Sequence, residues 1–223
     1  MRALLLMVTS SFLLVSMPFA AAANECLRIG VIEEGKAPLR VMKVGRRVFD
    51  QARLCVEFVL VPVRRAEAMT LAGELDGEMF RSEIWIKRHE DKVVGVPTPI
   101  YIDQMVAISL MEKKLGISSF DDLRGKRVVI TGGHRWAETR LGALGVSPVK
   151  ANSVDQFMEL LKVGRVEVGL LEESLIGDLG RLEGVVIKPV SPLPYFMVLR
   201  RRHADLMAVL DEAILWVRAN PAN

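Results

Sequence analysis

Residues 125–144 read GKRVVITGGHRWAETRLGAL, and the chain is organised around this segment. It contains a short apolar run of β-branched residues at 128–130, which is typical of a buried strand. A Thr-Gly-Gly turn at 131–133 ends the strand, and helix-forming residues follow at 135–144. A strand, a glycine turn and a helix start bring free backbone N–H groups together, which suits an anion. The alternative is a tight connection without a ligand, because the turn has neither a dinucleotide-binding nor a phosphate-loop pattern.

The first 23 residues have the pattern of a secretory signal peptide. Arg2 gives a positive start, residues 3–15 are apolar apart from three hydroxyl side chains, and the alanines at 20–23 provide a cleavage site after Ala23. A membrane anchor is the alternative, but the apolar run is too short to span a bilayer. Cys26 lacks the context of a lipid-attachment site. We therefore expect cleavage near Ala23 and a periplasmic, exported protein.

The composition argues against a nucleic-acid partner. The 223 residues include 30 Lys and Arg against 27 Asp and Glu, and both signs are interspersed along the chain. About 200 residues remain after the signal peptide, enough for one large or two small domains. No later stretch is long and apolar enough to be a transmembrane helix.

Two cysteines, Cys26 and Cys55, each stand at the start of an apolar run, 27–32 and 56–61. If these runs are neighbouring parallel strands, the two side chains lie next to each other at the strand starts. Export removes the reducing environment, so we expect a disulfide between them. The alternative is a pair of buried free thiols.

The first part of the chain alternates strands and helices. The periodicity predicts strands at 27–32, 56–61 and 75–80, with helices at 38–54 and 64–73 between them. This is a βαβαβ unit, which makes a parallel sheet whose ligands collect at the carboxyl ends of the strands. Those ends carry the following charged residues: Glu33, Glu34, Arg64, Arg65, Arg81 and Glu83.

A second alternation follows a proline-containing crossing at 93–102. The elements that we expect are strands at 125–130, 148–150 and 166–171, with helices at 136–144 and 153–163. Segments 185–190 and 195–199, separated by two prolines, predict a return crossing, and 204–218 predicts a final amphipathic helix. We therefore expect residues 24–104 plus 191–223 to form lobe 1 and residues 105–190 to form lobe 2. The cleft between the lobes would hold a small molecule.

This order of elements resembles the family 3 solute-binding proteins, which have the type II periplasmic binding fold and bind polar amino acids. The resemblance covers nearly the whole mature chain and rests on these stretches: LRIGVIEE from Leu27, GELDGE at 73–78, residues 96–101, SFDDLRGKRVVITGG, DQFMELLKVGRVEVGLLEE and PLPYFMVLRRRHADLMAVLDEAI. It implies an α/β fold with two lobes, each a mostly parallel sheet flanked by helices, joined by two hinge crossings.

The resemblance also implies a site for a free amino acid. By position, Arg88 matches the arginine that pairs with the ligand carboxylate, with Arg81 as a second candidate. Gly132 and Gly133 match the glycine turn that faces that carboxylate, and Glu172 matches the acid that pairs with the ligand ammonium. These roles agree with physics, because a guanidinium makes two parallel hydrogen bonds to a carboxylate.

The chain departs from the family pattern in three places. The loop after the first strand, EEGKAPLRVMKVG, has no aromatic residue to form a platform for the ligand. Glu172 replaces the more usual Asp, and Phe80, Arg81, Ser82 and Glu83 replace a run of small hydroxyl residues. Trp85 or Trp136 would then be the replacement for the missing aromatic platform, although core packing is the simpler account of a tryptophan.

Three further side chains are candidates for ligand contact, each with a plainer alternative. Arg64 lies at a strand end but is equally typical of a solvated surface, and Glu78 faces either the cleft or water at a sheet edge. His134 follows the glycine turn and is a candidate for ligand contact. No second His or Cys lies near it in the sequence, so a role as a capping or surface residue is the plainer alternative. No metal-ligand spacing occurs, and we expect no cofactor.

The sequence therefore predicts a periplasmic solute-binding protein, not an enzyme. It would capture a small polar or anionic solute, with an amino acid as one candidate, for an ABC-type transporter. A binding module for a sensor kinase is one alternative. An enzyme on the same fold, similar to the cyclohexadienyl dehydratases, is the other, with Glu78, His134 or Glu172 as acid or base. The expected partners are the solute and a membrane permease or sensor kinase, and the protein is expected to be a monomer.

Overall fold

The computed structural model describes residues 26–33, 38–179 and 183–221. The predicted signal peptide and its cleavage site lie outside these residues, as does Glu34 in the loop after the first strand. The side chains of residues 38–40 and 178–179 are also outside the description.

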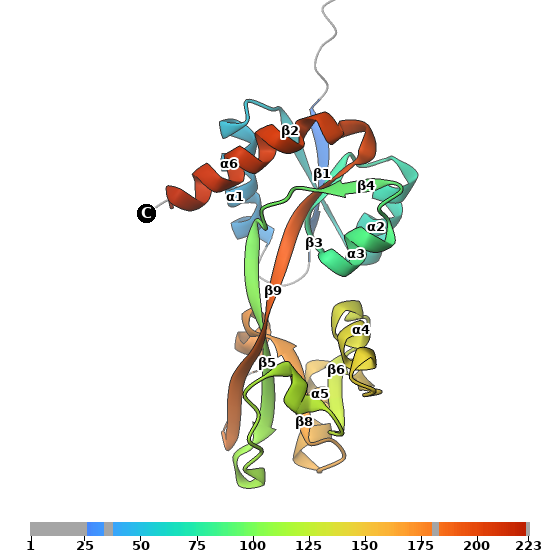
Figure 1. Cartoon of the computed structure of the whole chain (residues 1–223), viewed down its shortest axis with the longest axis vertical. Coiled ribbons are helices and arrows are strands. Elements are labelled where there is room, and N and C mark those ends of the chain that lie inside the picture. The colour runs from blue at the N-terminus through green and yellow to red at the C-terminus, as the bar shows by residue number, and fades with distance from the viewer. Residues whose placement is uncertain (1–25, 34–37, 180–182, 222–223) are drawn as a thin grey trace, which may run out of the picture.

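The described residues form two lobes joined by two long strands (Figure 1). The upper lobe contains β1 (Leu27–Ile32), α1 (Pro38–Gln51), β2 (Val56–Val61), α2 (Val63–Ala72), β3 (Gly77–Ser82), α3 (Glu83–Arg88), β4 (Val93–Gly95) and, at the end of the chain, a 3-10 segment (Arg201–Leu206) and α6 (Met207–Ala219). The lower lobe contains β6 (Val128–Thr131), α4 (Arg135–Ala143), β7 (Val149–Ala151), α5 (Val154–Lys162) and β8 (Val168–Glu172), with 3-10 segments at Met111–Lys113, Phe120–Leu123 and Glu173–Leu179.

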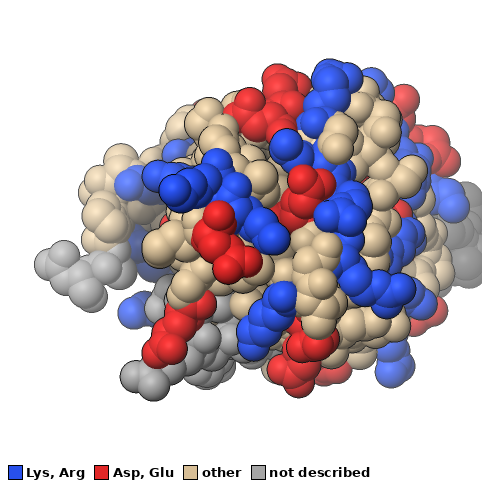
Figure 2. Space-filling model, turned by 90° about the horizontal axis from the view of Figure 1, so that it is seen from below, with Lys and Arg blue, Asp and Glu red and all other residues tan. Residues whose placement is uncertain are grey.

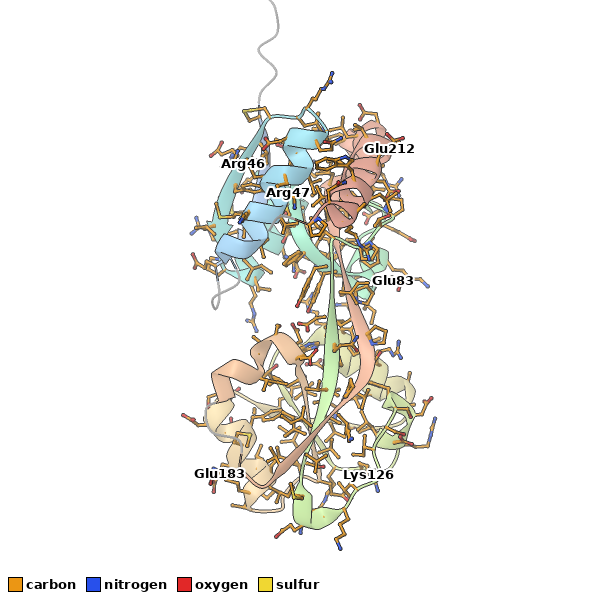
Figure 3. All side chains as sticks on the ribbon, turned by 90° about the vertical axis from the view of Figure 1, so that its left-hand side faces the viewer. Arg46, Arg47, Glu83, Lys126, Glu183 and Glu212 are labelled. Carbon is orange, nitrogen blue, oxygen red and sulfur yellow. A yellow bond between two sulfur atoms is a disulfide. The ribbon has the colours of Figure 1, made fainter. Side chains whose placement is uncertain are left out.

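The two connecting strands are β5 (Tyr101–Leu110) and β9 (Val185–Arg200), which run antiparallel to each other. Figure 3, turned by a right angle, shows the same division, with Arg46, Arg47 and Glu212 on the upper lobe and Lys126 and Glu183 on the lower. Both crossings therefore belong to one two-stranded ribbon, so any change in the angle between the lobes has to bend this ribbon.

The strands form one sheet in the order β2-β1-β3-β9-β5-β8-β6-β7, and β4 pairs with β9. Within the upper lobe β1 is parallel to β2 and β3, and within the lower lobe β6 is parallel to β7 and β8. The antiparallel pairs all involve β5 or β9. The predicted fold class, two mostly parallel α/β lobes joined by two crossings, is confirmed.

The predicted return crossing is present, but its division into two segments was wrong. Residues 185–200 form a single strand of 16 residues, although the strand contains Pro189, Pro192 and Pro194. These prolines lie where β5 is the strand's partner, before β9 meets β3 and β4. A proline cannot donate to a second neighbour, but it is tolerated on an edge and at the register shift opposite Met105 and Val106.

Other element boundaries moved by a few residues. The third strand is β3, Gly77–Ser82, two residues later than expected, because Asp76 turns back to accept a hydrogen bond from the backbone N–H of Arg28 at 2.9 Å. The short helix α3 and the strand β4 were not predicted. The final helix is divided into a 3-10 segment, Arg201–Leu206, and α6.

Each lobe has its own hydrophobic core. One cluster draws on residues 27–100 and 197–217, including the fully buried Ile29, Phe49 and Leu210. Two others draw on residues 105–193, including Phe157 and Leu170. The lobe boundaries after residues 104 and 190 stay a proposal; the cores divide near residue 104, whereas Leu193 packs in the core of the lower lobe. No helix in the described part of the chain has the length and apolar character needed to cross a membrane.

The predicted disulfide is present. Cys26 and Cys55 are joined, with their Cα atoms 4.5 Å apart. They lie at the starts of β1 and β2, whose parallel register pairs Leu27 with Val56. The bridge therefore fixes the two strands at the end of the upper lobe.

Candidate functional site

The glycine turn has the geometry that its sequence predicts. β6 ends at Thr131, and the backbone N–H of Gly132 donates to the carbonyl of Ala151 on β7 at 2.8 Å. Gly133 adopts a φ of 87°, a backbone conformation that residues other than glycine rarely adopt. His134 then caps α4, because its Nδ1 accepts a hydrogen bond from the backbone N–H of Ala137 at 3.2 Å.

Three side chains meet where the lower lobe joins the crossing strands. His134 Nε2 lies 2.9 Å from Glu172 Oε1, and the hydroxyl of Tyr195 donates to the same oxygen at 2.8 Å. Because Nδ1 of His134 accepts from the helix, the proton of the neutral ring is on Nε2, which donates to Glu172. Burial and the negative charge of Glu172 raise the pKa of Tyr195, so its phenol stays protonated.

An aromatic cluster connects Tyr195 with the upper lobe. The ring of Phe80, within β3, lies 5.9 Å from the ring of Tyr101 on β5 and 5.8 Å from that of Tyr195 on β9. Phe80 and Tyr195 are half-buried, and Tyr101 is 43% exposed. These three rings therefore form an aromatic cluster at the junction of the two lobes.

Neither tryptophan considered in the sequence forms this surface. Trp85 is buried beneath the guanidinium of Arg81, which lies 4.6 Å from its ring. Trp136 is buried against Phe120, with the two rings 5.6 Å apart. Both tryptophans pack inside their lobes, and Phe80, Tyr101 and Tyr195 were missed because they are separated in the sequence.

Asp103 completes the polar floor beside the aromatic cluster. It lies on β5, is 3% exposed, and accepts a hydrogen bond from the Ser174 hydroxyl at 2.6 Å. Its charge also contributes to the raised pKa of Tyr195. The site therefore has two carboxylates, Asp103 and Glu172, of which Asp103 is held by its own neighbours.

Glu78 and Arg81 form a buried ion pair within the upper lobe. Both side chains are nearly inaccessible, and a guanidinium nitrogen of Arg81 also donates to the Val63 carbonyl at 3.3 Å. Burial raises the pKa of Glu78, and the charge of Arg81 opposes that rise. Arg81 is thus already paired with a carboxylate, so a ligand would have to compete for it.

The other predicted arginines lie apart from this pair. Arg88 is the last residue of α3 and is exposed to solvent. Arg64 lies in the first turn of α2, is exposed, and faces a cavity that also contains Gly132 and Gly133. The structure therefore brings His134 to Glu172 and Arg64 to the glycine turn, while a ligand role for Arg88 and Arg81 stays a prediction.

An ion pair that the sequence did not indicate joins the lobes. A guanidinium nitrogen of Arg135, on α4 of the lower lobe, lies 3.1 Å from Glu67 Oε1, on α2 of the upper lobe. Burial alone opposes ionisation of Glu67, but the hydrogen bond and charge of Arg135 hold the pKa of this carboxyl below its usual value. Residues that face each other across a cleft leave no periodic pattern in the sequence.

The cavity between α2 and the lower lobe has a volume of about 620 Å³, within the range of small-molecule sites. Its walls come from Arg64, from the turn and first residues around α4, and from the turn between β7 and α5. No group of three His, Cys, Asp or Glu side chains that could hold a metal ion occurs among the described residues.

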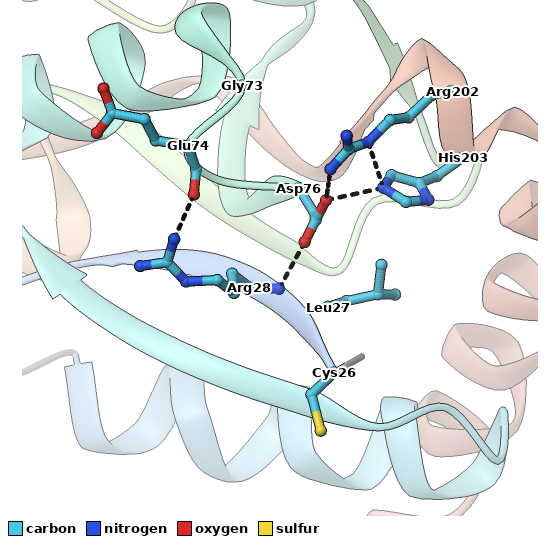
Figure 4. A pocket seen from close by; sticks show the side chains of 8 residues that line it. All are labelled: Cys26, Leu27, Arg28, Gly73, Glu74, Asp76, Arg202 and His203. Carbon is cyan, nitrogen blue, oxygen red and sulfur yellow. Dashed lines mark hydrogen bonds and ion pairs between the residues drawn. The ribbon is translucent and has the colours of Figure 1, made fainter. Parts of the chain in front are cut away.

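A second cavity, of about 510 Å³, lies in the upper lobe beside Cys26 (Figure 4). Its central carboxylate, Asp76, accepts from the Arg28 backbone at 2.9 Å, pairs with Arg202, and lies 2.8 Å from His203 Nε2. Despite partial burial, these donors hold the pKa of Asp76 below its usual value. The carboxylate of Asp76 therefore has its partners within the protein, and these contacts join β1 to the segment after β9.

Comparison with known proteins identifies the fold. No protein-family model matches the chain, and no curated protein matches it. Among solved structures, the arginine-bound form of ArgBP from T. maritima is 14% identical, with 86% of this chain and 95% of that chain covered and a TM-score of 0.60. The GluR0 ligand-binding core in complex with L-glutamate is 16% identical, with 87% and 93% covered and a TM-score of 0.63.

The VFT2 domain of Bordetella pertussis BvgS is also similar, with 15% identity, 85% and 87% of the two chains covered and a TM-score of 0.63. At these identities the likeness establishes the fold alone. The chain has the two-lobe type II periplasmic binding fold that the sequence predicted.

Proposed function

We propose that this chain is a periplasmic solute-binding protein that holds a small polar or anionic solute between its two lobes. The observation that carries the proposal is the group formed by His134, Glu172 and Tyr195. It lies at the cleft end of the lower lobe, and its contact with Phe80 reaches the upper lobe. A solute placed there would touch both lobes and the ribbon between them.

Glu172 is the residue best placed to bind a ligand ammonium group. Both of its hydrogen bonds end on Oε1, and no hydrogen bond to Oε2 is found among the described residues. The donors on Oε1 fix the direction of the carboxylate, which lowers the entropic cost of binding a ligand. The neighbouring aromatic faces favour a cation as well.

The similar structures support an amino acid as the first candidate solute, since one is arginine-bound and another contains L-glutamate. Delivery of the solute to an ABC-type permease is the role that we propose. A sensor-associated module would use the same cleft, and the protein made without a membrane partner should bind the solute in either case.

The proposal is tested by a thermal-shift screen of the purified protein against amino acids, organic acids and polyamines. A ligand at about 100 times its Kd stabilises the folded state by roughly 2.7 kcal/mol. Glu172→Gln should then weaken binding of a cationic solute by at least about tenfold. The matched control is Glu173→Gln, an exposed neighbour that should bind as the original protein does. Equal binding in all three proteins would remove Glu172 from the site.

A second candidate, an enzyme on this fold, is favoured by one contact. His134 and Glu172 form a hydrogen-bonded pair in the cleft, as a general acid and base would. Turnover of a prephenate-like acid that is lost in both His134→Gln and Glu172→Gln would support this function. If a ligand that binds is chemically unchanged after prolonged incubation with the protein, solute binding remains the proposed function.

A further inference from the structure

The ion pair between Arg135 and Glu67 joins the lobes beside the group proposed to hold the solute. A guanidinium nitrogen of Arg135, on α4, lies 3.1 Å from Glu67 Oε1, on α2. Figure 1 shows α4 at the side of the lower lobe that faces the upper lobe. Arg135 directly follows His134, whose ring contacts Glu172. The ion pair and the proposed solute site therefore share the start of α4.

The position of Arg135 is unfavourable for its own helix. Arg135 is the first residue of α4, and the N-terminal end of a helix carries partial positive charge that disfavours a cation. Local choices that oppose stability are typical of functional positions. The side chain is 49% exposed, and the contact that it gains is the one with Glu67 on the other lobe. The arginine is therefore better explained by a role between the lobes than by the stability of α4.

Glu67 also lies beside hydrogen-bond donors of its own lobe. His89 Nε2 is 3.7 Å from Glu67 Oε1, and the ring of His89 packs 4.8 Å from that of Trp85. Trp85 Nε1 and His89 Nε2 are buried, and neither makes a hydrogen bond of normal geometry among the described residues. Burial opposes ionisation of Glu67, whereas Arg135 and then Trp85 lower its pKa, so the indole N–H lies near the carboxylate. Buried donors without a partner are costly, which indicates a second arrangement in which they have one.

The carboxylate of Glu67 can therefore be satisfied with the lobes together or apart. With the lobes together it pairs with Arg135 across the cleft. With the lobes apart it can turn to the N–H groups of Trp85 and His89, while the half-exposed Arg135 returns to water. Neither arrangement leaves a buried charge unpaired, which would be the large cost. A small difference in free energy between two arrangements is what a solute is able to shift.

We propose that Glu67 is a two-position latch, which holds the lobes together through Arg135 and is received by Trp85 and His89 when the cleft opens. The inference goes beyond the proposed function, because it concerns the equilibrium between the two arrangements and not the groups that touch the solute. The latch stabilises the closed arrangement in addition to the contacts of the solute itself. It thereby sets how much of the solute's binding free energy is spent on closure.

The first test needs no solute. Spin labels on Lys87→Cys, in α3, and Thr139→Cys, in α4, occupy exposed positions on opposite lobes. In this background Glu67→Gln and Arg135→Gln should each shift the distances measured by pulsed electron resonance to a longer mean. The double variant should match the single variants, because all of them remove the same contact. Distances that are unchanged in both single variants would overturn the latch.

The matched control removes an ion pair that lies within one lobe. Glu167 pairs with Arg127 at 3.6 Å, and both residues belong to the lower lobe. Glu167→Gln removes a carboxylate as Glu67→Gln does and should leave the distances unchanged. An equal shift in the two variants would show that a general loss of charge, and not the contact between the lobes, is the cause.

The second position of Glu67 has a test of its own. Trp85→Phe keeps a ring in the core and removes the indole donor, and His89→Phe keeps a ring against Trp85 and removes the other. Each variant takes a partner from the open arrangement, so each should shift the distances to a shorter mean. Unchanged or longer distances in both variants would contradict the second position.

A binding measurement separates the latch from the proposed function. For the compound that raises the melting temperature most in the thermal-shift screen, Glu67→Gln should weaken the affinity about two- to fivefold. Glu172→Gln should lose that compound and keep the distances of the free protein. If the compound binds and Glu67→Gln changes neither affinity nor distance, the function stands and the latch is wrong. If Glu67→Gln lengthens the distances and no compound binds, the latch stands and the proposed function loses its support.

Discussion

At the scale of single residues, the charged groups of this protein fall into two kinds. Glu78 and Arg81 are buried and pair with each other, whereas Arg64 lies exposed at a cavity wall. A buried pair stabilises the fold only while both partners are present, because either charge alone is costly to bury. Charges at a cavity wall remain hydrated and are free to meet a ligand. The difference leads to two predictions at this scale.

Glu78→Ala should destabilise the fold by about 3–5 kcal/mol, since it leaves the Arg81 guanidinium buried without its carboxylate. The measurement is urea unfolding followed by circular dichroism. The double variant Glu78→Leu, Arg81→Met should recover part of the loss, because no unpaired charge then remains. Glu74→Ala, on an exposed residue nearby, is the control and should change the stability little. A double variant less stable than Glu78→Ala would contradict this account.

Glu67 should make a pH-dependent contribution to stability. Its pKa is lowered in the folded state, so the stabilisation is present above the unfolded value of 4.5 and is lost as the pH falls through the folded pKa. The free energy of unfolding of the original protein should exceed that of Glu67→Gln at pH 7, by up to about 1 kcal/mol for this partly exposed pair. At a pH below the folded pKa the difference should disappear. A difference that is the same at both pH values would show that the charge of Glu67 is not its cause.

At the scale of elements, the neighbouring strands β3 and β9 approach each other closely at Gly77. A Cβ built on Gly77 would lie 2.1 Å from the Val198 carbonyl oxygen, a backbone atom that cannot move aside. Gly142, on α4, has no atom within 4 Å of such a Cβ. The same substitution at the two glycines should therefore have opposite effects.

Gly77→Ala should cost at least about 2 kcal/mol of stability, because the added methyl group forces the two strands apart. Gly142→Ala should instead stabilise the protein by about 0.5–1 kcal/mol, since alanine favours the helix. Thermal unfolding of each variant, compared with that of the original protein, measures the change in stability. A Gly77→Ala variant as stable as the original protein would show that β3 and β9 are not held this closely.

The disulfide between β1 and β2 should contribute about 3–4 kcal/mol, the loop entropy expected for a bridge between residues 29 positions apart. The Cys26→Ser, Cys55→Ser double variant should show this loss in urea unfolding. Reduction of the original protein should produce the same loss, and the reductant should not change the variant. Unfolding midpoints that are equal with and without the bridge would contradict a stabilising role.

The elements were predictable from the sequence where they depend on local patterns. The strand, turn and helix at 128–143 were expected because β-branched residues, glycines and helix formers follow each other directly. The return crossing was expected, but its continuity as one strand, β9, was not, since proline is tolerated there only through a particular pairing with β5. The resemblance placed Glu172 in the site because it follows a strand of the lower lobe, and its ligand role stays a prediction. Tyr195 and the pair of Glu67 with Arg135 were missed, because their contacts depend on how the lobes face each other.

At the scale of the whole molecule, the lobes meet through few groups. The ribbon of β5 and β9 connects them, and the ion pair of Arg135 with Glu67 lies beside the cavity under α2. The far end of the lower lobe carries interspersed positive and negative side chains (Figure 2).

The central claim is that a solute draws the two lobes together. Spin labels on Ala68→Cys, in α2, and Thr139→Cys, in α4, lie on exposed positions of opposite lobes. The distance between them, measured by pulsed electron resonance, reports on the opening of the cleft. With the solute that stabilises the protein most, we predict a single narrow distribution at a shorter mean distance than in the free protein. An identical distribution with and without that bound solute would contradict the account.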